Sequence, residues 1–518
     1  MFKSFFTISF FISISRILGF IRDILIAKFV GVSILSDAFF GSFRLPNFFR
    51  RIFAEGAFNS AFVPIFIEKI ADHKDPKNHE QVKYFVANIF SILLYALLIF
   101  VLIMQIFMPF FMKLLFPGFF SDPEKSRLLI SFSHITIFYL IFISLVSLFS
   151  GILNSLNKFA IPASSPIILN LTLILMIIAF GTKFPNYGYA LSFGVLIAGL
   201  LQFLFLCYGV YRQGYLVYPK IPKFNYDIKK FFKKLLPGII GANVMQINLL
   251  VDSIFASAIF GAISYLYYAD RINQLPLAMI GIAIGIALLP NLTRRLKNQE
   301  FEQANNLQNI AIEAGLILVL PATLALTILS YPIIDVLFKR GAFGENEAVL
   351  VAKALMFYSF GLPSFVLVKV MEPAFFARSD TKTPMKIAIL CLVNNIVFNY
   401  IFFILEFGFV GIILASIISS YLNLLMLIKI SIKRQYFYFQ KDFTKKLLII
   451  AFPTILMGFT IYISNYLFSL NNFNKIFALI FTIFIGTLVY FLSSYLSGSL
   501  KIMVDVLKLK KLKDVKNK

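Results

Sequence analysis

Long apolar runs follow one another along almost the whole 518-residue chain, and this feature constrains its fold most strongly. A helix needs about 20 mainly apolar residues to cross a bilayer. By that rule we expect about fourteen transmembrane helices, at 5–29, 36–66, 84–112, 127–153, 161–180, 188–211, 235–259, 262–290, 306–337, 348–376, 384–404, 409–432, 447–468 and 474–499. Only 14% of the residues are charged, against about 25% in soluble domains. The sequence therefore predicts an all-α polytopic membrane protein and excludes a soluble enzyme, a disordered chain and a nucleic-acid-binding protein.

The basic residues are distributed unevenly between the two sets of alternating loops. The chain carries 48 Lys and Arg against 24 Asp and Glu. With the N-terminus as the first connection, one set of loops holds 32 Lys and Arg and the other holds 8. Because cytoplasmic loops collect Lys and Arg, we predict that both termini are cytoplasmic.

A short motif occurs twice, six expected spans apart. LPNFFRR at 45–51 returns as LPNLTRR at 289–295, with five of seven positions identical. Spans six apart have the same orientation, which predicts two six-helix lobes in a parallel pseudo-twofold repeat, with a central cavity between them. The predicted parts are an N-terminal lobe at 1–220, a C-terminal lobe at 221–440, two extra transmembrane helices at 441–500 and a basic cytoplasmic tail at 501–518.

Charged residues lie inside several expected spans. A charge at the bilayer centre costs about 2.5 to 3.5 kcal/mol on insertion scales. In the first span, five polar or small residues share one arc of about 120°. They are Ser15, Arg16, Gly19, Arg22 and Asp23. This arc must face a hydrated interior rather than lipid.

Further intramembrane charges follow in the second and eighth spans. The second span carries Asp37, Arg44, Arg50, Arg51 and Glu55, and the eighth carries Asp270 and Arg271. One interpretation is that these groups form interhelical ion pairs that only hold the bundle together. However, six arginines face four acids, and surplus guanidinium groups favour an anionic ligand such as a phosphate. Elsewhere we favour packing for Asn170 and an intrahelical pair for Lys369 and Glu372.

At these motifs the chain resembles a known family. SRILGFIRDILIAKFVG, SDAFFGSFRLPNFFRRIFAEGAFNSAFVP, YYADRINQLP and ARSDTKTP resemble the MurJ (MviN) family of bacterial lipid II flippases. That family belongs to the exporter superfamily (MOP) that also contains the MATE transporters. The resemblance runs from the first span to the twelfth, whereas the last two spans match by position and apolar character only.

The resemblance implies a flippase rather than an enzyme. Its substrate would be lipid II, the undecaprenyl-diphosphate-linked disaccharide pentapeptide used for peptidoglycan synthesis. Alternating access would carry it from the inner to the outer leaflet of the bacterial inner membrane, with the two extra helices flanking a groove for the lipid tail. The implied substrate-binding residues are Arg16, Arg22, Arg50 and Arg271, with Ser15, Asp23 and Asp37 beside them; Arg51, Glu55 and Asp270 would support them.

Several alternatives stay open from the sequence. Transport would be driven by the membrane potential or by a coupling cation bound by Asp252, Asn243 and Gln246. We expect no metal site or other cofactor. The expected partners are lipid II and membrane lipids but not nucleic acid, and the sequence does not determine the protein partners. The alternative functions are export of another polyprenyl-diphosphate oligosaccharide and a MATE-type exporter. A membrane glycosyltransferase would need catalytic carboxylates or histidines near a sizeable outer loop, and the sequence has none there.

Overall fold

The computed structural model describes residues 2–52, 58–70, 76–223, 225–242, 244–470 and 473–501. Within these ranges the chain folds into helices and has no β-strand. The helices pack into two compact units. The first comprises Met1–Ser264 and Arg340–Phe343, and the second comprises Tyr265–Lys339 and Gly344–Lys518.

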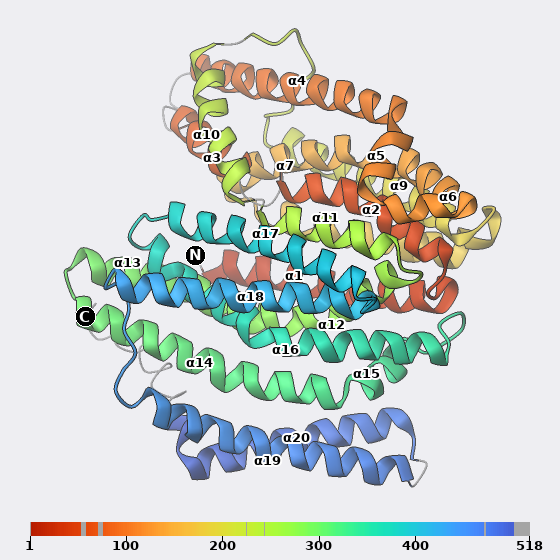
Figure 1. Cartoon of the computed structure of the whole chain (residues 1–518). Helices are drawn as coiled ribbons and strands as arrows, with labels where there is room; N and C mark the ends of the chain where they lie inside the picture. The colour runs from red at the N-terminus through yellow and green to blue at the C-terminus, as the bar shows by residue number, and fades with distance from the viewer. Residues whose placement is uncertain are drawn as a thin grey trace. The chain divides into compact units, whose positions relative to one another are not determined.

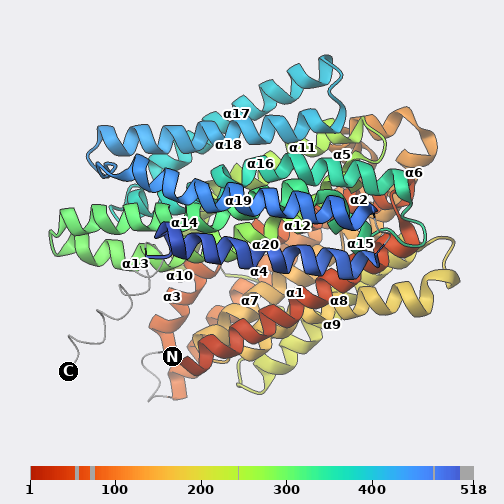
Figure 2. The same cartoon turned by 90° about the horizontal axis from the view of Figure 1, so that it is seen from below.

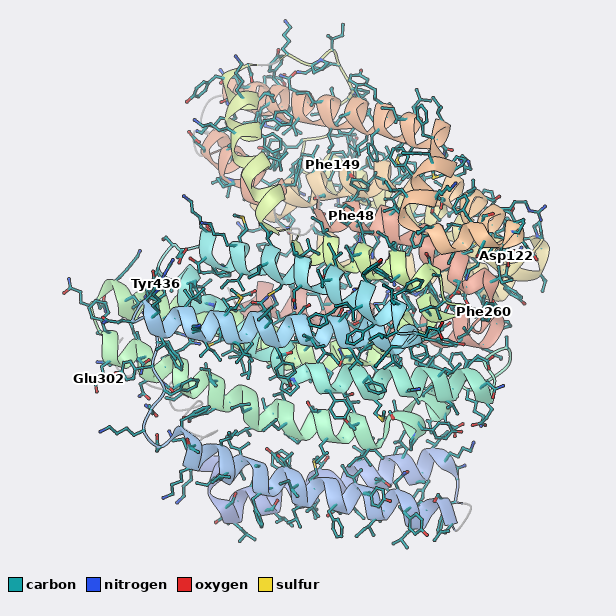
Figure 3. All side chains as sticks on the ribbon, in the orientation of Figure 1. Phe48, Asp122, Phe149, Phe260, Glu302 and Tyr436 are labelled. Atoms are coloured by element: carbon teal, nitrogen blue, oxygen red, sulfur yellow. The ribbon has the colours of Figure 1, made fainter. Side chains whose placement is uncertain are left out.

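The first unit contains the helices up to the start of α12 (Figure 1). Their bounds are α1 Phe2–Val30, α2 Ile34–Ile52, α3 Phe58–Ile70, α4 Pro76–Ile106, α5 Met108–Leu115, η2 Pro117–Ser121, α6 Pro123–Thr136, α7 Tyr139–Ser155, α8 Ala160–Leu175, η3 Met176–Phe180, η4 Gly181–Lys183, α9 Tyr187–Tyr211, α10 Tyr226–Ala242 and α11 Val244–Ser257. Phenylalanines fill much of its interior. Phe149, labelled in Figure 3, stacks on Phe90 and Phe203 with ring centroids 5.8 and 5.7 Å away.

The second unit contains the remaining helices. Their bounds are α12 Ala262–Pro276, which begins in the first unit, η5 Leu277–Ile282, α13 Ala283–Lys297, α14 Phe301–Ile328, α15 Ser330–Leu337, α16 Glu345–Phe376, α17 Lys382–Ile404, α18 Gly408–Lys433, α19 Phe443–Leu470 and α20 Lys475–Ser497. The pair Lys369–Glu372 forms within α16 with 3.1 Å between Nζ and Oε2, which confirms the intrahelical pairing predicted for it.

Helices α19 and α20 lie side by side in both views (Figures 1 and 2) and form a hairpin. Three polar contacts join this hairpin to α14 and α15. They are Lys446 Nζ to Glu313 Oε1 at 3.0 Å, Tyr490 Oη to the Ile317 carbonyl at 2.5 Å, and Lys475 Nζ to Asp335 Oδ2 at 2.8 Å. Glu313 and Asp335 are buried, so the hairpin is bound to the other helices of the second unit by charge as well as by apolar contact.

The membrane-spanning character agrees with the sequence. Within the described ranges, 11 helices are long and apolar enough to cross a membrane. The other three expected spans fall on α1, on α2 with α3, and on α10 with α11. These segments are helical, but parts of their sequences or side chains lie outside the described residues. The chain is an all-α polytopic membrane protein; the count of fourteen spans and the lobe boundaries stay predictions.

Candidate functional site

The polar stripe of α1 is organised around Arg22 and Asp23. Both residues are buried, at 7% and 2% exposure. Nε and Nη2 of Arg22 donate to the same Asp23 oxygen at 3.0 and 2.7 Å. Nη1 of Arg22 donates to Oδ1 of Asn170 on α8 at 2.9 Å, and Asn170 in turn donates to the Ser15 carbonyl at 2.9 Å. Asn170 lies over Gly19, where an added Cβ would be 3.5 Å from its Nδ2, in ordinary van der Waals contact. These contacts hold the Arg22 guanidinium in one orientation.

Arg16 differs from its neighbour on the same stripe. It is exposed, and among the described residues it forms no hydrogen bond or ion pair. Arg50, half-buried on α2, donates from Nε to Oδ1 of Asn47 at 2.8 Å. Arg50 and Arg22 both lie within electrostatic range of the buried Tyr139 on α7. The first unit therefore brings Arg22 and Arg50 to the same neighbourhood.

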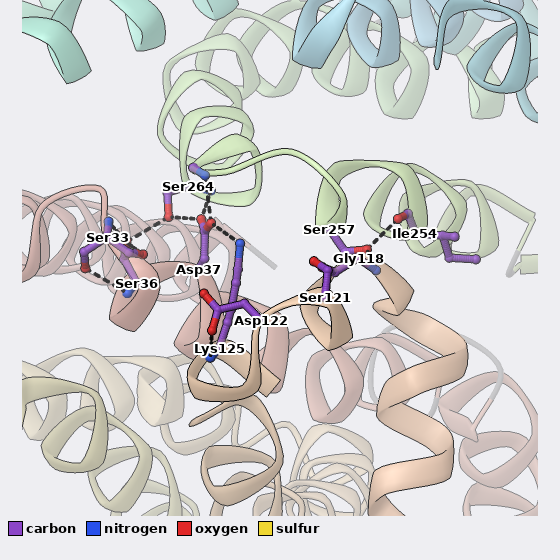
Figure 4. A network of polar contacts seen from close by, with 11 residues as sticks. Ser33, Ser36, Asp37, Gly118, Ser121, Asp122, Lys125, Ile254, Ser257 and Ser264 are labelled. Carbon is purple, nitrogen blue, oxygen red and sulfur yellow. Dashed lines mark hydrogen bonds and ion pairs between the residues drawn. The ribbon is translucent and has the colours of Figure 1, made fainter. Parts of the chain in front are cut away.

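Asp37, at the start of α2, is the centre of a second network (Figure 4). Its carboxylate is fully buried and accepts four hydrogen bonds. The donors are Lys125 Nζ at 3.2 Å, the backbone N–H of Gly261 at 2.9 Å, the backbone N–H of Ser264 at 3.1 Å and the Ser264 hydroxyl at 2.7 Å. Gly261 directly precedes α12 and Ser264 lies in its first turn, so the carboxylate satisfies orphan N–H groups at the positive end of that helix. This geometry gives Asp37 a structural role, because it joins α2 to α6 and to the start of α12. Contact between Asp37 and the substrate stays a prediction.

Lys125 reaches Asp37 because of how α6 begins. The Asp122 side chain accepts hydrogen bonds from the backbone N–H groups of Glu124 and Lys125, at 2.9 and 3.2 Å. Pro123 follows this N-cap at the first helical position, where its missing N–H costs nothing. The cap places Lys125 in the first turn, with 5% of its surface exposed. Its ammonium also lies 4.1 Å from the ring centroid of Phe119.

Arg44 serves a packing function in the first unit. Its Nη1 donates to the Leu249 carbonyl at 3.3 Å and to the Ser253 hydroxyl, both on α11. One of the six intramembrane arginines therefore joins two helices, through a backbone carbonyl and a hydroxyl group.

Arg271 and Asp270 lie in the second unit, and both are half-buried. Nη2 of Arg271 donates to the Tyr267 hydroxyl at 2.9 Å, and the guanidinium carbon lies 4.6 Å from the centroid of that ring. Asp270 accepts a hydrogen bond from Gln274 one turn later. Arg271 is thus oriented by a tyrosine from its own helix.

The residues predicted for ion coupling are only partly described. Asp252 is buried on α11 and Gln246 is half-buried, whereas Asn243 lies outside the described residues. Glu55 and the side chain of Arg51 also lie outside them. Within the described part of the chain, no three His, Cys, Asp or Glu side chains form a group that could hold a metal ion.

The family is decided by a comparison with family models. The model described as lipid II flippase MurJ matches residues 26–499, which is most of the chain and includes nearly all of its helices. The chain belongs to the MurJ family. The match extends through α19 and α20, for which the sequence resemblance rested on position and apolar character alone.

Relatives of the MurJ family cover nearly the whole chain. A probable lipid II flippase MurJ of Rickettsia prowazekii is 37% identical over 504 residues, covering 96% of this chain and 97% of the relative. One of Rhizobium tropici is 39% identical, covering 86% and 83%. A solved lipid II flippase MurJ in an inward closed conformation aligns with a TM-score of 0.77 at 30% identity, covering 94% of this chain and 98% of that one. A MATE transporter of the MOP superfamily aligns with a TM-score of 0.65 at 16% identity, which shows a shared fold.

Three polar residues of these networks were not among the predicted site residues. The sequence favoured packing for Asn170, and Lys125 counted only as an outer-loop charge. The Asp-Pro-Glu-Lys order at 122–125 does indicate a helix start, but no sequence signal indicates that Lys125 reaches Asp37. Ser264, beside the YYADRINQLP motif, carries no signal of its own.

Proposed function

We propose that this chain moves lipid II from the inner to the outer leaflet of the bacterial inner membrane, with both termini cytoplasmic. The diphosphate would bind to Arg16, Arg22, Arg50 and Arg271. The observation that carries the proposal is the polar stripe of α1, which combines a buried, oriented guanidinium with an exposed and unpaired one. A stripe of this kind inside a membrane helix suits an anionic ligand. The names of the MurJ relatives support lipid II as that ligand.

Each arginine has a separate part in this proposal. Arg22 is preorganised by Asp23 and Asn170, so it loses little side-chain freedom when a phosphate binds. Arg16 is exposed and supplies a charge that is not already neutralised. Arg271, oriented by Tyr267, adds a cation from the second unit. The proposed activity is transport without a catalytic step, because binding and release of an intact lipid need no nucleophile or general base.

The driving force that we propose is the membrane potential. Moving one negative charge outward across an inside-negative membrane gains about 2.3 kcal/mol per 100 mV. A lipid diphosphate would carry that charge. The alternative is a cation bound at Asp252 and Gln246, and a requirement for sodium ions or a proton gradient at constant potential would favour it.

The test is complementation of a host whose own lipid II flippase is depleted, with lipid II on the outer leaflet as the readout. The variants are Arg16→Ala, Arg22→Lys and Arg271→Ala, and each must reach the membrane in normal amount. Arg22→Lys keeps the charge beside Asp23 but loses the planar fork. The matched control is Lys28→Ala, an exposed cation on the same helix.

Rescue by the parent and by Lys28→Ala, with loss of rescue in the three arginine variants, is the expected result. Rescue by all three variants would limit these arginines to structural roles. If a well-inserted parent fails to rescue, the substrate is another polyprenyl-linked sugar.

A further inference from the structure

A cavity outside the arginine sites opens at the beginning of α4 in the first unit. Its volume is about 450 Å³, and its lining includes Lys83 and Tyr84 from α4 and Tyr218 and Lys220 from the segment between α9 and α10. The cavity is open to the outside, since 78% of Tyr218 and 42% of Tyr84 are exposed. It takes no part in the function proposed above.

Hydrogen bonds to two side chains of α4 hold one wall of this cavity in place. Residues 215–223, between α9 and α10, have no regular secondary structure and contact α4. The backbone N–H of Lys220 donates to the Ser91 hydroxyl at 2.8 Å, and the backbone N–H of Lys223 donates to Oδ1 of Asn88 at 3.2 Å. Ser91 and Asn88 are fully buried on α4. The position of Lys220 is therefore built into the fold.

The cavity has a net positive charge. The Lys220 ammonium lies 3.3 Å from the ring centroid of Tyr84 and donates to the Tyr84 carbonyl at 3.2 Å. No carboxylate of the described residues pairs with it, and burial together with the charge of Lys223 lowers the pKa of Lys220. The one acid in the lining, Glu80, is 4.0 Å from Lys83 and mostly exposed. An anion bound between Lys83 and Lys220 would neutralise their positive charge.

The cavity lies at the expected depth for a membrane surface. The apolar span of α4 begins at His79, so Lys83 and Tyr84 stand within its first two turns. The loop charges assign this end to the cytoplasmic side. Tyrosines are enriched at the headgroup level, and Ile221, which follows Lys220, is 86% exposed.

We propose that this cavity binds the headgroup of an anionic phospholipid of the inner leaflet. The phosphate accepts hydrogen bonds from the ammonium groups of Lys83 and Lys220. The exposed ring of Tyr218 and the side chain of Ile221 contact the glycerol and the upper acyl chain. Anionic lipid therefore anchors the segment between α9 and α10 to the membrane surface.

The experiment measures retention of phosphatidylglycerol and phosphatidylcholine by the purified full-length protein, using native mass spectrometry after titration with each lipid. The test variant is Lys83→Gln with Lys220→Gln. The matched control is Lys429→Gln with Lys433→Gln, two exposed lysines at the end of α18 on the side assigned to the cytoplasm. A lysine near an anionic surface changes binding about fivefold, so the test variant should bind phosphatidylglycerol about 25-fold more weakly. The control and the parent should bind it equally.

Equal retention of the two lipids by the parent would overturn the proposal. So would unchanged binding in the Lys83 and Lys220 variant, provided that its thermal unfolding matches that of the parent. Inorganic phosphate is the second probe. If millimolar phosphate displaces the lipid completely from the parent, the cavity is a site for free phosphate groups and not for a lipid.

Discussion

The network around Asp37 leads to a testable prediction about the energetic coupling between the Asp37 carboxylate and the Lys125 ammonium. Asp37→Asn keeps the shape of the side chain but leaves the Lys125 ammonium, 5% exposed, without a counter-charge. Removing one partner of a buried ion pair costs about 3–5 kcal/mol. Lys125→Met removes the cation instead. The carboxylate then keeps three hydrogen bonds from Gly261 and Ser264 at the positive end of α12, so we expect a smaller loss of about 1–3 kcal/mol.

The double variant, Asp37→Asn with Lys125→Met, tests whether the stability losses of the two single variants add. It leaves no buried charge, so it should be more stable than Asp37→Asn alone. Thermal unfolding in detergent can be followed with a thiol-reactive dye, because Cys207 is half-buried and Cys391 is buried. Lys113→Met, at an exposed position, is the control and should unfold like the parent. If the double variant unfolds at or below the temperature of Asp37→Asn, the two charges do not depend on each other and the reasoning is refuted.

Three further predictions use the same unfolding assay. Gly31→Ala should destabilise by more than the 1–2 kcal/mol typical of a left-handed residue, because φ is +65° and the new Cβ would lie 2.2 Å from the Ala342 carbonyl oxygen; a parent-like unfolding temperature would contradict this. Glu313→Leu leaves the Lys446 ammonium without its buried partner and should destabilise, whereas adding Lys446→Met should restore part of the loss. Arg16→Ala should abolish transport with unchanged unfolding, and a large loss of stability would show a structural role.

The sequence was informative about the helices and about the stripe on α1. Helical periodicity alone placed Ser15, Gly19, Arg22 and Asp23 on one face. In the structure the first three lie against Asn170, and Asp23 pairs with Arg22. The lengths of the apolar runs were equally informative, since the need to cross a bilayer is a property of consecutive residues. Both features are local, so they can be recognised without knowing the fold.

The partners of the buried charges were not predictable in the same way. The sequence offered arginine neighbours to each acid, and this holds for Asp23 with Arg22. Asp37 instead pairs with Lys125, 88 residues away, and with Ser264, 227 residues away.

The sequence by itself thus determined the membrane class, the helices and the polar face of α1, because each depends on the spacing of residues along one helix. Only the tertiary structure decided which charges are neutralised and which stay exposed. Charge pairing depends on distance in space and on burial, and residues far apart in the chain reach that distance only when the helices pack.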